Sequence, residues 1–201
     1  MTLKAPPSLD LTGQTTKKAL RRYSDWTRLA WFPHLGDHGM DDRASDLFVM
    51  SLGLAGENGE LQEAVADGNQ VAVRKELGDV IYYWGRLASF YDLDVGAMVD
   101  LAQSTAPSEK GPLLALRLGQ WIGRSVEIIK KSVRDDGLDH NGLQATMGFA
   151  LGYWLRTCQA HELDSTSILQ ESVDKILARH TQGTLRGSDK PDGRRTQVAH
   201  R

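Results

Sequence analysis

The sequence predicts an all-α protein, and two observations lead to that class. Apolar residues recur at three- and four-residue spacing along most of the chain, while the alternating pattern typical of strands does not occur. Breaks that contain Gly, Pro and Asn separate the periodic segments at intervals that suit helices. We therefore expect a bundle of helices joined by short turns.

The first half of the chain contains four expected helices. A loose leader rich in Pro, Gly and polar residues covers residues 1–14, and a loop covers residues 32–42. The helices are expected over residues 15–31, 44–66, 70–91 and 95–103. The turn DGN at 67–69 makes the second and third helices neighbours, and Asp94 is expected to cap the fourth.

The second half has a similar organisation after a linker over residues 104–112. Its helices are expected over residues 113–132, 140–160 and 165–181. We divide the chain into the leader, a first half over residues 15–104, a second half over residues 113–182 and a polar tail over residues 183–201.

An internal repeat relates the two halves. The stretch LGDVIYYWGRLASFYDLD (77–94) matches MGFALGYWLRTCQAHELD (147–164) at Gly, Tyr, Trp, Arg and the final Leu-Asp, with an offset of 70 positions. Farther upstream, Gly59 matches Gly123 with an offset of 64 positions. The sequence therefore predicts two helical hairpins of one design, packed about a pseudo-two-fold axis.

Composition narrows the class of function. The chain has 24 Lys and Arg against 26 Asp and Glu, a formal charge of −2, which argues against nucleic-acid and membrane-surface binders. The single cysteine, Cys158, allows no intrachain disulfide and is expected to be buried. No apolar run is as long as a membrane span, and we expect a cytoplasmic protein.

Two pairs of acids flank the apolar stripes of consecutive expected helices. Glu57 and Glu60 are three residues apart in GENGELQEAV, and Glu76 and Asp79 are three apart on the next helix. Residues three apart lie on neighbouring faces of a helix, so each pair forms one acidic flank. Because a short turn makes the helices antiparallel neighbours, the flanks can face each other and bring four carboxylates together.

Four carboxylates at close range repel one another, so a positive charge is expected among them. A hard divalent cation suits an all-oxygen ligand set, and Mg²⁺ typically binds a few carboxylates together with substrate phosphates. The pattern indicates a Mg²⁺ site, with Mn²⁺ as an alternative ion, and chemistry at a polyphosphate. The simpler interpretation is that each pair is a solvated helix face. Gly56 and Gly59 are expected to let a ligand or partner helix approach the backbone.

The stretch GLAGENGELQEAV, followed by RKELGDVIYYWGRLA, has the spacing E-x-x-E, 15 residues, E-x-x-D. It resembles the MazG-type, all-α nucleoside triphosphate pyrophosphohydrolases. The stretch YSDWTRLAWFP (23–33) is similar to their N-terminal helix, and KILARHTQGTLRGSDKPDGRR (175–195) is similar to the basic ending of phage- and bacterial-type members. The resemblance covers most of residues 20–195.

The resemblance implies an enzyme that hydrolyses a (deoxy)nucleoside triphosphate to the monophosphate and pyrophosphate and so controls nucleotide pools. It implies that two or more Mg²⁺ ions are held, with the substrate, by Glu57, Glu60, Glu76 and Asp79, and we assign Glu60 as the general base. By family analogy we expect a homo-oligomer, a dimer or tetramer, with no nucleic-acid or membrane partner.

The chain departs from single-copy members of that family. An extra helical hairpin over residues 113–160 intervenes before the basic ending. In it, the positions that match the four acids carry Trp121, Arg124, Thr146 and Phe149. The second half therefore resembles a degenerate copy, as in the tandem-repeat dUTPase branch of the superfamily.

Four further residues are candidates for substrate contacts, and each has a simpler alternative. Lys75 directly precedes the second acidic pair and either contacts phosphate or is an exposed ion-pair partner. Lys175 and Arg179 match the family's basic ending, where phosphate binding is implied; a solvated helix end is the alternative. Tyr83 lies on the acidic flank, but its recurrence as Tyr153 favours packing.

A second class of function stays open on the sequence. The chain could be a catalytically poor nucleotide-sensing or interaction module that keeps the helical scaffold. The loss of the acids in the second half shows how a copy can decay, whereas the intact acids of the first half argue for an enzyme.

Overall fold

The computed structural model describes residues 5–30, 42–105, 108–135 and 137–182. Every regular element among them is a helix, so the predicted all-α class is confirmed. The helices are α1 (Thr16–Ala30), α2 (Asp42–Ala66), α3 (Gln70–Phe90), α4 (Val95–Ser104), α5 (Pro112–Asp135), α6 (His140–Ala160) and α7 (Ser165–Gln182). The expected tail lies outside the described residues, as does the expected loop up to residue 41.

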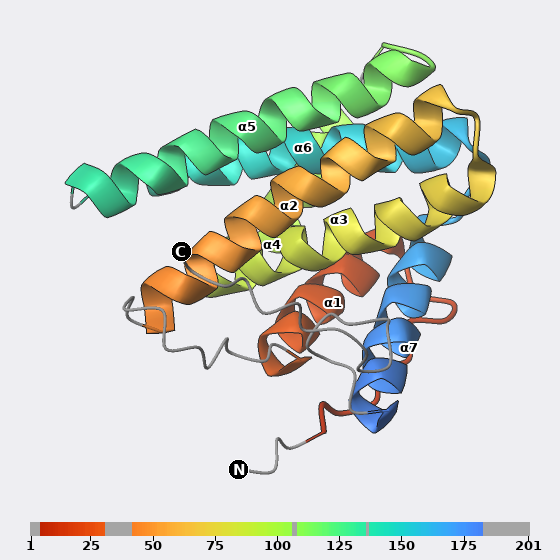
Figure 1. Ribbon diagram of the computed structural model, residues 1–201, viewed down its shortest axis with the longest axis horizontal. Helices are drawn as coiled ribbons and strands as arrows, with labels where there is room; N and C mark the ends of the chain where they lie inside the picture. The colour runs from red at the N-terminus through yellow and green to blue at the C-terminus, as the bar shows by residue number, and fades with distance from the viewer. Residues whose placement is uncertain (1–4, 31–41, 106–107, 136, 183–201) are drawn as a thin grey trace, which may run out of the picture.

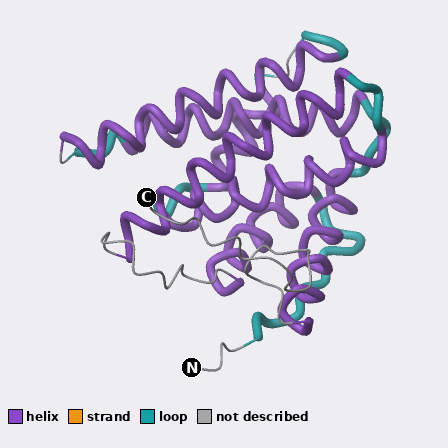
Figure 2. Tube along the Cα trace, viewed as in Figure 1, coloured by secondary structure: helices purple, strands orange, loops and turns teal. Residues whose placement is uncertain are grey.

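Two antiparallel hairpins, α2 with α3 and α5 with α6, make up the larger part of the molecule (Figure 1). They are joined by contacts of α2 with α5 and of α3 with α6, and α4 packs against α6. Below them, α1 and α7 lie together against α3 (Figure 1). Figure 2 shows that the described regular elements are all helices. Helix α3 therefore contacts four other helices and is the central element of the fold.

Polar caps and a left-handed glycine fix the turn between α2 and α3. Gly68 has φ +66°, a backbone conformation that side chains disfavour, and Asn69 follows as the N-cap of α3. The Asn69 side chain accepts a hydrogen bond from the backbone N–H of Ala72 at 3.1 Å. The tight turn holds α2 and α3 antiparallel.

Asp94 caps α4 in the same way, as the sequence predicted. Its side chain accepts a hydrogen bond from the backbone N–H of Ala97 at 3.0 Å.

Helices α3 and α6 are joined by a reciprocal pair of hydrogen bonds. Trp84 Nε1 donates to the carbonyl oxygen of Met147 at 3.0 Å, and Trp154 Nε1 donates to the carbonyl oxygen of Leu77 at 2.9 Å. Both bonds are buried. The two donors, Trp84 and Trp154, are 70 positions apart, and so are the two acceptors, Leu77 and Met147. The same interaction is thus made twice, once from each half.

The loops after α3 and α6 also correspond. Asp92 (φ 50°) and Glu162 (φ 57°) are the non-glycine residues with positive φ within the described part of the chain, and they are 70 positions apart. Gly78 of α3 lies against α7, while Gly148 of α6 lies against α4. The second helix of each hairpin therefore packs against the last helix of the other half.

The described part of the leader has no helix but packs against the bundle. Leu11 is fully buried, and its backbone N–H donates to Gln170 Oε1 of α7 at 2.9 Å. Trp26 is buried and donates from Nε1 to the Pro7 carbonyl oxygen at 2.7 Å, so it is a core residue. Cys158 is buried, as predicted.

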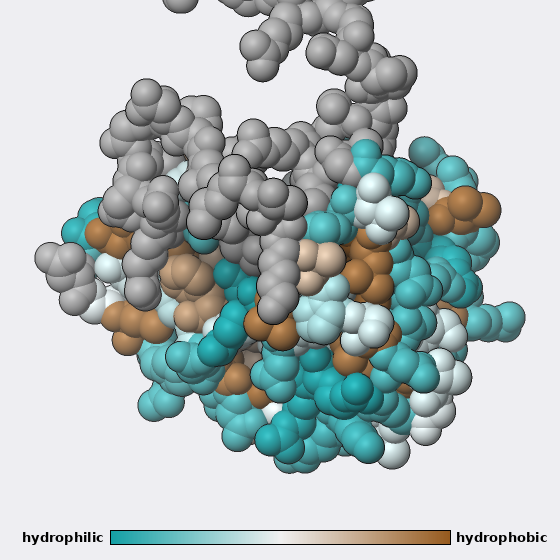
Figure 3. Space-filling view, turned by 90° about the horizontal axis from the view of Figure 1, so that it is seen from below, coloured by the Kyte–Doolittle hydropathy of each residue, from teal (hydrophilic) through white to brown (hydrophobic). Residues whose placement is uncertain are grey.

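The surface is polar over most of the described area that Figure 3 shows, with hydrophobic residues in small groups. Among the described helices, none combines the length and the apolar character that a bilayer span needs.

Candidate metal centre

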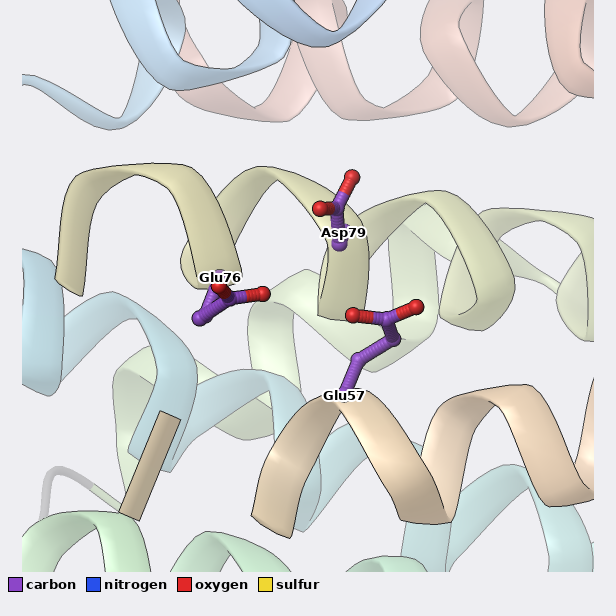
Figure 4. A group of neighbouring side chains, drawn as sticks. All are labelled: Glu57, Glu76 and Asp79. Atoms are coloured by element: carbon purple, nitrogen blue, oxygen red, sulfur yellow. The ribbon is translucent and has the colours of Figure 1, made fainter. Parts of the chain in front are cut away.

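Three carboxylates from two helices meet beside the core. Glu57 comes from α2, and Glu76 and Asp79 come from successive turns of α3 (Figure 4). Each offers an oxygen that lies within 4.8 Å of an oxygen of the other two. The predicted approach of the two acidic flanks is therefore present for these three residues.

The apolar stripes of the hairpin place the acids. Leu54 and Leu61 of α2 and Leu77 of α3 are fully buried, and their packing fixes which faces of the two helices meet. The acids flank this seam and differ in exposure. Glu76 is 5% exposed, Asp79 and Glu57 are partly buried, and Glu60 is exposed.

The crowding of carboxylates changes the protonation of Glu57. Burial, followed by the charges of Asp79, Glu60 and Glu76, raises the pKa of Glu57 to about 7, while Lys75 opposes the shift. Metal-free protein therefore carries a proton on Glu57 over part of the physiological pH range.

Two lysines form ion pairs with the other two acids. Lys75 Nζ lies 2.6 Å from Glu76 Oε1 and 3.6 Å from Asp79 Oδ2. Lys175 of α7 donates to both oxygens of Asp79, at 2.5 and 2.6 Å. Lys75 and Lys175 are predicted from the sequence to contact phosphate. The structure places both ammonium groups at the acids, where a phosphate bound to the same cluster would meet them.

The residues present fit a hard divalent cation. Oxygens of three carboxylates are the ligands that Mg²⁺ and Mn²⁺ prefer. Glu76 Oε2 is buried and has no hydrogen-bond partner within the described residues, although a buried acceptor normally has one. A cation among the three carboxylates would satisfy this oxygen.

Glu60 lies outside the group of three. Its side chain is exposed, yet it is near enough for its charge to raise the pKa of Glu57. Its predicted roles as metal ligand and general base stay predictions.

Tyr83 forms a wall of the site. The position of its ring requires a glycine at residue 53, which the sequence pattern does not indicate. A β-carbon built on Gly53 would lie 2.5 Å from two ring atoms of Tyr83, so the ring rests directly on the backbone of α2. Burial, then the charges of Glu57 and Asp79, raise the pKa of Tyr83, whereas Arg179 lowers it. Tyr83 is therefore close to the acids, and Arg179 is close to Tyr83.

No neighbouring helix approaches Gly56 or Gly59, and the expected approach of a ligand to them stays a prediction. A β-carbon on Gly56 or Gly59 would meet no atom within 4 Å, because both lie on an exposed part of α2. The close approach occurs one turn earlier, at Gly53, and only the contact between α2 and α3 reveals it.

The corresponding positions of the second half hold an aromatic stack. Trp121 of α5 stacks on Phe149 of α6 with 4.4 Å between ring centroids, and the Arg124 guanidinium lies 4.4 Å from the Trp121 ring. Ser125 Oγ donates a hydrogen bond to Thr146 Oγ1 at 3.0 Å. These side chains supply no carboxylate.

A comparison with protein families identifies the segment that carries the acids. Residues 49–102 match the MazG nucleotide pyrophosphohydrolase domain. The MazG match spans most of α2, all of α3 and most of α4, and it contains the four acids together with Gly53 and Tyr83. No curated protein and no solved structure matches the chain. The resemblance to MazG-type enzymes is thereby confirmed over this segment.

Proposed function

We propose that the chain is a Mg²⁺-dependent nucleoside triphosphate pyrophosphohydrolase that converts a (deoxy)nucleoside triphosphate and water to the monophosphate and pyrophosphate. The observation that carries the proposal is the three-carboxylate cluster, with its unpartnered Glu76 oxygen, inside the segment that matches the MazG domain. Its role would be the control of nucleotide pools. Mn²⁺ is an alternative ion.

In the proposed reaction the four acids have two roles, metal binding and proton transfer. Glu57, Glu76 and Asp79 hold the ions, and Glu60 at the open side of the cluster completes the ligand set and takes a proton from the attacking water. When bound, two or more Mg²⁺ ions lower the pKa of water and neutralise phosphate charge. Because the acids are fixed on two packed helices, the site is organised before the substrate arrives.

The basic residues complete the site on the substrate side. Lys75 and Lys175 are ion-paired with the acids in the metal-free state, so their ammonium groups are already next to the phosphate position. With the acids bound to cations, the two ammonium groups would be available to donate to the phosphates of the substrate. In this proposal Tyr83 borders the substrate, and Arg179, whose charge acts on Tyr83, also contacts phosphate.

The second half is, in this proposal, a degenerate copy of the first. The reciprocal bonds of Trp84 and Trp154, and the matching left-handed residues, support a common design. The Trp121 and Phe149 stack fills the place of the metal site. The second half then serves as the partner hairpin that single-copy members obtain by association. Assembly of the whole chain into dimers or tetramers and a cytoplasmic location remain predictions.

Release of pyrophosphate from a panel of ribo- and deoxynucleoside triphosphates, with Mg²⁺, Mn²⁺ or EDTA, tests the proposal. Glu57→Gln and Asp79→Asn should each reduce turnover by orders of magnitude with an unchanged helical circular-dichroism signal. Glu63→Gln is the matched control, because Glu63 is exposed on α2 away from the cluster and its loss should leave the rate unchanged.

Two results would refute the proposal. If either acid variant keeps more than about a tenth of the activity, the cluster does not hold the catalytic ions. If the wild-type protein binds triphosphates with Mg²⁺ but releases no pyrophosphate from any of them, the chain is a nucleotide-sensing module.

A further inference from the structure

A cleft lies on the side of α2 away from the acids. It runs between α2 and α5, has a volume of about 580 Å³, and includes Asn58, Gln62, Gly119 and Ile122 among its lining residues. Asn58 adjoins Glu57 in the chain, but successive residues of a helix point about 100° apart. Glu57 therefore meets α3 while Asn58 meets α5.

Two amide side chains converge on one glycine of α5. A β-carbon built on Gly119 would lie 2.5 Å from Asn58 Nδ2 and 2.6 Å from Gln62 Nε2. Any side chain at residue 119 would therefore displace the two amides, and glycine leaves them in place. A β-carbon on Gly123, one turn later in α5, would meet no atom within 4 Å. Of these two glycines of α5, only Gly119 lies against the amide pair.

The amide of Asn58 is incompletely paired in the protein. Asn58 is 4% exposed, and its Oδ1 has no hydrogen-bond partner within the described residues. Buried amides normally find partners, and this oxygen, on a residue that lines the cleft, can gain one from a ligand if the amide turns toward the cleft. A half-turn of the amide exchanges its oxygen and nitrogen, which allows the group to accept or donate toward the cleft.

The rest of the cleft selects the class of ligand. Ile122 forms an apolar wall, and Leu113 and Leu116 at the rim are 42% and 56% exposed. Arg117 donates to Gln120 at 2.7 Å and lies 3.7 Å from Glu109, so its charge is already balanced. The cleft therefore offers apolar surfaces and amide groups with no free cation, which suits an uncharged planar ring better than a phosphate.

We propose that the cleft between α2 and α5 binds the heterocyclic base of an uncharged nucleoside, with the Asn58 and Gln62 amides reading the edge of the base. Asn and Gln amides can pair with the donor and acceptor groups of a base edge, and the apolar walls contact the ring faces. The volume lies within the range of small-molecule sites. This site is separate from the acids and does not depend on the proposed hydrolysis.

Binding of nucleosides to the full-length protein in EDTA tests the inference, because chelation removes any contribution of the metal centre. Adenosine, guanosine, cytidine, uridine and thymidine are titrated by calorimetry and by saturation-transfer NMR. At least one should bind saturably with a Kd below about 1 mM. Gly119→Ala and Asn58→Leu should each weaken that binding at least about tenfold.

Two controls separate the amide pair from other causes. Gly123→Ala should keep the affinity within about threefold, because its new methyl group meets no amide. Glu57→Gln should also keep it, whereas Gly119→Ala should still bind Mn²⁺ at the acids like the wild type. Since Gly119→Ala changes only one methyl group, it preserves the test if Asn58→Leu does not fold.

Three outcomes would overturn the inference. The first is no saturable binding of any nucleoside up to about 10 mM, and the second is equal affinity in Gly119→Ala and the wild type. The third is a dimer in light scattering that Leu116→Glu converts to a monomer, which would show that a second copy covers the cleft.

Discussion

Glu57→Gln should make the metal-free protein more stable, and the gain should depend on pH. The pKa of Glu57 is about 7 in the folded protein, against an ordinary value of 4.5. Between these values the folded state binds more protons than the unfolded state, so the stability of the wild type falls as pH rises. Glutamine has no proton to lose and escapes this penalty.

The size of the effect follows from the pKa shift. The difference between 4.5 and about 7 corresponds to an upper limit of about 3 kcal/mol, because one pKa unit is worth about 1.4 kcal/mol. Glu57 is only partly buried, so solvent screening reduces the expected value to about 1–3 kcal/mol. The advantage of the variant should be absent near pH 4.5, grow up to pH 7 and stay constant above it.

Urea unfolding in EDTA between pH 4.5 and 8.5 measures this difference. The control is Glu63→Gln, which removes an exposed glutamate from the same helix. Adding Mg²⁺ at pH 8 should stabilise the wild type and leave Glu57→Gln nearly unaffected, because only the wild type keeps the full ligand set. The reasoning fails if the variant is less stable than the wild type at pH 8 in EDTA, or if its advantage does not change with pH.

Three further changes test other parts of the account. Lys175→Met should lower kcat/KM at least about tenfold while Mn²⁺ binding without nucleotide is unchanged or tighter; weaker Mn²⁺ binding would contradict a counter-ion role. Gly53→Ala should lower the free energy of unfolding by about 1–3 kcal/mol, because its methyl group collides with Tyr83, whereas the control Gly56→Ala should be neutral or stabilising in the same urea titration. A fragment of residues 1–104 should be insoluble or molten, and a well-dispersed amide NMR spectrum of a monomer would disprove that expectation.

Local sequence rules were sufficient for the helices and for part of the site. The turn with Gly68 and Asn69 and the spacing of the apolar residues predict that α2 and α3 are antiparallel. Once that is known, the three-residue spacing of Glu76 and Asp79 places both toward Glu57. These features depend on residues close in the chain, so periodicity and capping were enough to find them.

The remaining features depend on contacts that spacing along the chain does not encode. Lys175 meets Asp79 across 96 residues, and only the packing of α7 on α3 brings them together. The contact between Gly53 and Tyr83 depends on the depth at which α2 and α3 approach each other. The sequence points to Gly56 and Gly59, which are close to the acids in the chain, whereas the close contact between the two helices is made at Gly53.

The reciprocal contacts give the half without the acids a structural role beside the site. Trp84 of the acid-bearing half needs the carbonyl oxygen of Met147, and Leu77, next to Glu76, receives the indole of Trp154. The helix that carries two of the three acids is therefore held in place by the other half. In the half without the acids, the stack of Trp121 on Phe149 contributes to the contact between α5 and α6. Loss of Trp154 would act on the site more directly, because its indole binds the backbone of α3 beside Glu76.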